Sequence, residues 1–284
     1  AIRDPGLSTR RRGTVIKLMS LFQKIRSNLQ DDQLFRRVLR NSSYLFSSSA
    51  ISAVLSAVQM IIVVRLLDPD GYGLATGIIM VFASNVNRFL SFRMSEVIVR
   101  YAGEALTHEK KDHAAALIKG IGIIEAITSI VAYLVLVALS PWAASVLAKD
   151  SSAMPLFIFY GFFLLANIVY ETSLGVLQVT DRFKLVARAN FSQSIVIFLS
   201  IIAISLWMPT VFGVLAAYLV GKTIAGVMVT GSAIREAERT LGKGWLRAPL
   251  RLISNWRSIG RFMLSTNING TINLLARDNI PIYI

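Results

Sequence analysis

Charged side chains occur inside stretches of the sequence that are otherwise apolar. Glu125 stands alone in one such stretch, Lys222 in another and Arg88 in a third. Ionisable groups in long apolar segments are costly, so they usually face a helix-bundle interior or a water-filled cavity. A carboxylate at Glu125 must find a cation, find water or be protonated, and Lys222 is a candidate partner. Arg88 has no acidic residue at i+3 or i+4, so we expect its charge to face a cavity or a substrate phosphate.

Polar residues also recur at helical spacing. Arg88 shares one helix face, about 140 degrees wide at 3.6 residues per turn, with Asn85, Arg93, Glu96 and Arg100. The part of this face beyond Arg88 is either a cavity wall or an interfacial end with snorkelling arginines.

Three further stretches carry such faces. One face consists of Thr266, Asn269, Asn273 and Arg277, with Asp278 beside it. The pair Arg277 and Asp278 belongs either to a cavity, which we favour, or to an outer interface. Another face carries Asn167, Glu171 and Gln178, and a third carries Ser48, Ser52, Ser56 and Gln59. For the serine-rich face, close helix packing is favoured over cavity lining, because small residues let helices approach in membranes.

Nothing in the sequence indicates catalysis. The chain has no Cys, and its two histidines, His108 and His113, lie in a charged segment without ligand spacing. This excludes thiol chemistry and predicts neither a metal site nor a cofactor. Phosphate-loop, HExxH and GxSxG motifs are absent, so we expect no ATPase or hydrolase chemistry and no enzyme activity.

The elements that carry these residues are predicted to be membrane-spanning helices. Hydrophobic residues make up 54% of the chain and charged residues only 16%. Long uncharged windows recur, and about 20 apolar residues suffice for one helical span. Six spans are expected within residues 41–233, with turns at Asp68 to Gly71, at Ser140-Pro141 and at Trp207 to Thr210. The predicted fold class is therefore an all-α, polytopic transmembrane bundle.

Basic residues predict the orientation of these spans. Of the 30 Lys and Arg residues, 23 fall in residues 1–40, 101–119, 178–188 and 233–261, whereas the alternate gaps hold only Lys149. By the positive-inside rule, the N-terminus is cytoplasmic. The net charge of +14 is explained by topology and anionic membrane lipid, so nucleic acid is not an expected partner.

The chain divides into four expected regions. Residues 1–40 form a basic cytoplasmic or interfacial segment, 41–233 the six-helix lobe, and 234–260 a basic cytoplasmic linker. Residues 261–284 begin a seventh helix inside which the sequence ends. We expect a second lobe to follow in the complete protein and expect the 284-residue chain not to transport by itself.

Three motifs resemble those of a known family. The sequence LLDPDGYGL at 66–74 is similar to the "LGPxxYGL" turn of polysaccharide transporters, the Wzx-type oligosaccharide flippases. In the same order, VIVRY at 97–101 resembles the end of their second helix, and VLQVTDRFK at 176–184 resembles their loop after the fourth. Arg261-Phe262 matches the start of their seventh helix. Asp68 departs from the family, which often has Gly there.

The resemblance implies a fold and an activity. The fold is that of multidrug and toxic compound extruders (MATE-like), with two six-helix lobes around a central cavity that works by alternating access. The activity is flipping of isoprenoid-diphosphate-linked oligosaccharide, as for O-antigen lipopolysaccharide, across the inner (cytoplasmic) membrane. The cationic route is then assigned to Arg88, Lys222 and Arg277, with Asn85 and Asn273 lining it. Glu125, Glu171 and Asp278 would be counter-charges or proton- or sodium-coupling groups.

Two other functions compete with this one. A drug or cation antiporter of the same superfamily would need a carboxylate-dominated cavity, against which the three cations argue. A membrane-embedded glycan polymerase or ligase would carry a large extracytoplasmic loop, whereas the outer gaps here are short. A glycan polymerase or other export machinery remains a possible partner.

Overall fold

The computed structural model describes residues 33–207 and 209–273, and the chain divides into two compact units at Phe46/Ser47. The first unit contains the beginning of helix α2, and the second contains the rest of α2 and the helices that follow it. Within the described ranges, regular secondary structure is entirely helical. Five helical stretches there are long and apolar enough to cross a membrane, namely Ser42–Thr107, Lys111–Leu147, Ser151–Val179, Phe183–Trp207 and Val211–Leu241. The all-α, multi-pass membrane fold is thus confirmed.

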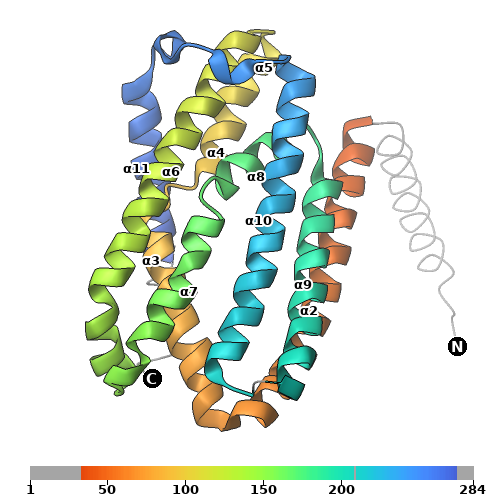
Figure 1. Ribbon diagram of the computed structural model, residues 1–284. Helices are drawn as coiled ribbons and strands as arrows, with labels where there is room; N and C mark the ends of the chain where they lie inside the picture. The colour runs from red at the N-terminus through yellow and green to blue at the C-terminus, as the bar shows by residue number, and fades with distance from the viewer. Residues whose placement is uncertain (1–32, 208, 274–284) are drawn as a thin grey trace, which may run out of the picture. The chain divides into compact units, whose positions relative to one another are not determined.

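The first of these stretches contains two antiparallel arms. It has 66 residues, far more than one ~30 Å hydrocarbon core requires at ~1.5 Å per residue. Asp68 has φ 61° and ψ 167°, which interrupts the helix, and Pro69 follows it. The chain turns back there, as Figure 1 shows at the bottom of the view. The predicted turn at Asp68 is therefore present, and α2 (Gln33–Tyr72) runs through it.

The second arm is broken in its middle, which corrects our expectation of one continuous helix. It begins with a π-helical turn, η1 (Gly73–Met80), and continues as α3 (Val81–Leu90). Residues 91–93 are not helical, and Arg93 has the left-handed φ of 49°. The helix then resumes as α4 (Met94–Val97), η2 (Ile98–Ala102) and α5 (Gly103–Thr107). The polar face predicted from Asn85 to Arg100 is therefore not continuous.

The later spans include a second break. The third span is α6 (Lys111–Trp142) with the π-helical turn η3 (Ala143–Leu147). After η4 (Ser151–Ala153), the fourth is interrupted between α7 (Met154–Ala166) and α8 (Tyr170–Val179). The fifth and sixth are α9 (Phe183–Trp207) and α10 (Val211–Leu241). Two short turns, η5 (Trp245–Arg247) and η6 (Leu250–Leu252), lead to α11 (Trp256–Asn273).

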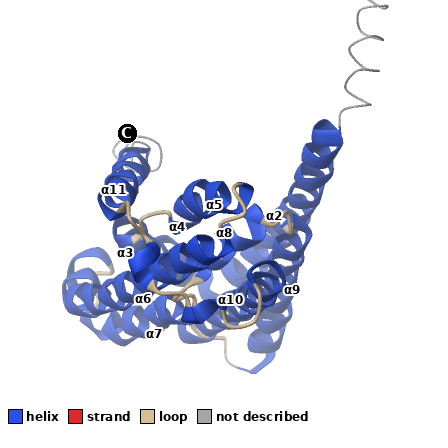
Figure 2. Cartoon of the chain, turned by 90° about the horizontal axis from the view of Figure 1, so that it is seen from above, coloured by secondary structure: helices blue, strands red, loops and turns tan. Residues whose placement is uncertain are grey.

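Helix packing places the two breaks in the same part of the bundle. Helix α6 packs on α7, α7 on α10 and α10 on α9, whereas α3 packs on α6 and α11 packs on α3 and α4. Figure 2, seen from above, shows α3 and α11 beside the α6 end of this row and α9 at its opposite end. A core of large side chains joins α3, α6, α7 and α10, and in it Phe82 and Phe157 meet edge to face at 5.5 Å.

The segment between α10 and α11 packs against the bundle. Gly120 on α6 lies so close to it that a Cβ there would meet Trp256 at 2.9 Å and Ile253 at 3.0 Å. The Lys119 ammonium donates a hydrogen bond to the Ala248 carbonyl oxygen at 3.2 Å. Gly120 therefore serves close packing, as its position in an apolar span predicts.

Candidate functional site

Glu125 caps the helix that begins after the break in the fourth span. Its two carboxylate oxygens accept hydrogen bonds from the backbone N–H groups of Glu171 and Thr172, both at 2.8 Å. These amides belong to the first turn of α8, whose donors have no partner within their own helix. A carboxylate is favoured at this end of a helix, because the backbone dipoles make it partly positive. Glu125 itself is 6% exposed.

Helix α11 supplies hydrogen-bond donors to the backbone carbonyl groups at the break in the second arm. The Asn267 side-chain amide donates to the carbonyl oxygens of Phe89 at 3.1 Å and Ser91 at 3.0 Å. The Thr266 hydroxyl lies 3.4 Å from the Phe92 carbonyl oxygen. A backbone group without a partner in lipid costs several kcal/mol, so a broken span needs donors of this kind. Side chains far away in sequence therefore support both breaks.

One hydrogen bond joins the two broken spans. The Ser95 hydroxyl, just after the first break, donates to the Glu171 carboxylate at 2.6 Å. Glu171 lies in the first turn after the second break. The two interrupted helices are thus connected directly where their backbones change direction.

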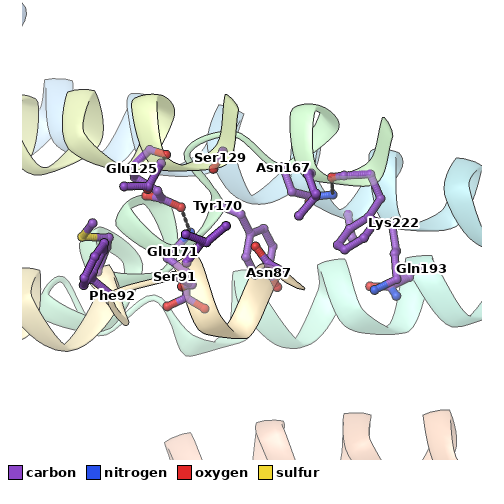
Figure 3. Close-up of a pocket in the computed structure, with 16 residues that line it drawn as sticks. Asn87, Ser91, Phe92, Glu125, Ser129, Asn167, Tyr170, Glu171, Gln193 and Lys222 are labelled. Carbon is purple, nitrogen blue, oxygen red and sulfur yellow. Dashed lines mark hydrogen bonds between the residues drawn. The ribbon is translucent and has the colours of Figure 1, made fainter. Parts of the chain in front are cut away.

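A polar cavity of about 240 Å³ lies between the breaks. Three of the predicted residues, Glu125, Glu171 and Lys222, line it. Figure 3 places Glu125 and Glu171 toward one end and Lys222 with Gln193 toward the other. The remaining polar lining includes Asn87, Ser91, Ser129, Asn167, Tyr170 and Gln193.

Lys222 has no carboxylate partner among the described residues. Its ammonium group stands 4.7 Å from the centroid of the Phe163 ring, a cation–π distance. The suggested pair of Glu125 with Lys222 does not form: the two side chains lie toward opposite ends of the cavity (Figure 3), and backbone amides bind both oxygens of Glu125. A partly buried ammonium beside a polar cavity is suited to bind an anion, since no ion pair in the described part of the chain competes for it.

The other predicted site residues lie elsewhere. Asn85 and Arg88 are on α3 but do not line this cavity, and Arg88 is exposed in the last turn of that helix. Asn273 is the final residue of α11, and its side chain lies outside the described residues. Arg277 and Asp278 also lie outside the described residues. Their assigned roles stay predictions.

Sequence reasoning missed the residues that the breaks expose. Ser91 and Tyr170 border the cavity because the helix stops beside them, and apolar periodicity carries no sign of that interruption. Gly226 was a usable signal, since any Cβ there would collide with the Asn167 side-chain oxygen at the second break. Beyond the first break, Arg93 and Glu96 form an ion pair at 2.7 Å between exposed side chains.

The helices and the cavity define a multi-pass membrane protein with a polar, partly charged site at two helix breaks. Comparison with known proteins gives the family. Residues 38–276 match the family described as polysaccharide biosynthesis protein, and the chain belongs to that family.

A curated relative is also a membrane protein. The chain is 26% identical over 156 residues to the inner membrane protein YghQ of Escherichia coli strain K12, which covers 55% of this chain and 43% of YghQ. The chain thus matches less than half of that relative's length. No solved structure matches the chain.

Proposed function

We propose that the protein is a transporter, not an enzyme, and that it flips isoprenoid-diphosphate-linked oligosaccharide across the inner membrane. Membership of the polysaccharide biosynthesis family supports a substrate of this class. A diphosphate and its sugars need a hydrated, cationic route, because neither can cross ~30 Å of hydrocarbon. The similarity to an inner membrane protein supports the location.

The observation that carries the proposal is Lys222 at the cavity between the two broken helices. Transport sites are often built from discontinuous membrane helices, whose ends present backbone groups to a ligand at mid-membrane depth. Here Glu125 neutralises the positive end of α8, so among the described residues that line the cavity Lys222 is the cation available to attract a phosphate. We assign Lys222 to the diphosphate and propose alternating access, with a Wzx-type substrate and a MATE-like second lobe, as the mechanism.

The test uses the full-length protein in a flippase-null strain, with surface glycan and membrane protein level as readouts. Lys222→Met should abolish surface glycan at normal protein level, and Lys222→Arg should retain part of it because the charge remains. The matched control is Lys243→Met, an exposed lysine in the segment after α10, which should be silent. Normal glycan from Lys222→Met would refute the assignment.

Arg88→Ala gives a second comparison in the same strain. The sequence predicts loss of export from this variant, but Lys222 lines the cavity and Arg88 does not. We therefore expect Lys222→Met to reduce export more than Arg88→Ala. A drug or cation antiporter would restore no surface glycan in the flippase-null strain, either as the wild-type protein or as any variant.

A further inference from the structure

A second cavity, of about 560 Å³, borders the first. Gln193 and Lys222 line both of them, so the lysine stands at their common wall. Side chains from α2, α9 and α10 form most of the second cavity, and Met80, Ser84 and Tyr160 complete its lining. Lys222 is the single charged residue among those that line it in the described part of the chain.

Several polar groups at this cavity have no partner within the described protein. Tyr160 is 1% exposed, and its hydroxyl forms no hydrogen bond with any described residue. The same holds for the side-chain amides of Asn190 and Gln193 and for the hydroxyl of Tyr218. These groups line the cavity with hydrogen-bonding capacity that no described residue uses, so they are suited to a polar ligand.

Helix packing explains only part of the polar lining. Ser52 and Ser194 share a hydrogen bond of 2.8 Å, and the Gln59 amide donates to the Ser194 carbonyl oxygen at 3.1 Å. These two contacts fasten α2 to α9, which agrees with the packing role expected for the serine-rich face. These contacts do not involve the polar side-chain groups of Tyr160, Asn190 and Gln193, whose position at the cavity therefore has another reason.

We propose that the second cavity binds an uncharged sugar unit, the one next to the diphosphate, while Lys222 holds the diphosphate at the common wall. This inference rests on the proposed function. Hydroxyl and amide groups both donate and accept hydrogen bonds, as sugar hydroxyls do. The rings of Tyr160 and Tyr218 offer apolar surface with a polar tip. Among the described residues, an acidic sugar would find no cation at this cavity except the lysine already engaged with phosphate.

The test measures binding of three lipids to the purified full-length protein in lipid nanodiscs. The probes are a bare polyisoprenyl diphosphate, the same lipid with one neutral hexose, and the same lipid with one hexuronic acid. The wild-type protein should bind the neutral glycolipid about tenfold more tightly than the bare lipid, as one or two net hydrogen bonds would give. It should bind the acidic glycolipid more weakly than the neutral one.

Variants separate the two cavities. Tyr160→Phe/Asn190→Leu removes a hydroxyl and an amide at nearly constant volume, so it should abolish the tenfold preference for the neutral sugar and leave binding of the bare lipid unchanged. Lys222→Met should weaken binding of all three lipids. Ser205→Ala, on α9 but outside this cavity, is the matched control and should change nothing.

The outcomes separate a failure of the proposed sugar site from a failure of the proposed transport function. Wild-type protein that binds none of the three lipids would overturn the proposed function. Equal binding of the bare and neutral lipids, or a preference for the acidic sugar, would overturn the sugar site alone. Because those results come from the unmodified protein, the inference stays testable even where a variant misfolds.

Discussion

The carboxylate of Glu125 on α6 lies 2.8 Å from the backbone nitrogen of Glu171 on α8. The sequence predicts that Glu125 pairs with a cation. In the structure it instead caps a helix that begins inside the bundle. Glu171 in turn accepts a hydrogen bond from Ser95 beside the other break. Two carboxylates of the candidate site thus hold the interrupted backbones together.

Glu125→Leu should destabilise the protein. The variant removes both acceptors from the first turn of α8, and loss of a helix cap costs about 0.5–2 kcal/mol. Glu125→Gln should lower the stability less, because the glutamine carbonyl oxygen can still accept one of the two hydrogen bonds. Thermal unfolding in detergent measures the order, with the exposed Glu238→Leu on α10 as the control. Equal melting temperatures for Glu125→Leu and wild type would contradict the capping role.

Arg182→Met should also lower the melting temperature. Glu236 is buried, and Arg182 lies 2.9 Å from it, whereas Arg239 is 3.7 Å away. A buried carboxylate without its main partner is costly, but Arg182 is half-exposed, so we expect a loss of about 1–3 kcal/mol. Arg182→Met/Glu236→Met removes both charges and should recover most of that loss. A double variant no more stable than the single one would contradict a pairwise role.

Asp68→Gly should stabilise the protein. Asp68 has φ 61° and ψ 167°, a conformation that glycine adopts readily and other residues adopt at a cost of about 1–3 kcal/mol. Asp70→Gly is the control, since Asp70 is helical and should lose stability. The position matches the one at which the similar flippase turn often has Gly. A lower melting temperature for Asp68→Gly than for wild type would show that the turn has another conformation.

Asn267→Leu should loosen α11 from α3. A Cβ at Gly270 would lie 3.7 Å from the Arg93 side chain. In the double variant Arg93→Cys/Gly270→Cys, a short bifunctional thiol reagent should therefore cross-link the two cysteines. Adding Asn267→Leu should reduce the cross-linking yield severalfold, because this variant loses the hydrogen bonds to Phe89 and Ser91. Asn269→Leu on the same helix is the comparison. An unchanged yield from Asn267→Leu would remove the basis for this attachment.

The orientation predicted from basic residues can be tested in the Cys-free chain. Lys149 and Lys243 are both exposed, in the segment after η3 and the segment after α10 respectively. An impermeant thiol reagent added to intact cells should label Lys149→Cys and leave Lys243→Cys unlabelled until the cells are opened. The opposite pattern would invert the topology.

The spans and the first turn were predictable because they depend on local signals, namely apolar length and the Asp68-Pro69 break. The cavity was predictable in part, since Glu125 and Lys222 are conspicuous by charge alone. The breaks at Ser91 and Asn167 were not, because the groups that stabilise them are Asn267 and Glu125, far away in sequence. Periodicity within one helix holds no record of a hydrogen bond from another.

The attachment of Asn267 has a consequence for the order in which the protein is made. Ribosomes deliver the second arm to the membrane before Asn267 exists, since 176 residues separate it from Ser91. The carbonyl groups of Phe89 and Ser91 then lack their later donor, and hydrocarbon does not tolerate such groups unpaired. The arm therefore enters the bilayer either as an unbroken helix or with its middle still hydrated. We therefore expect its interrupted shape to be completed only after α11 has been synthesised, as a late step of biogenesis.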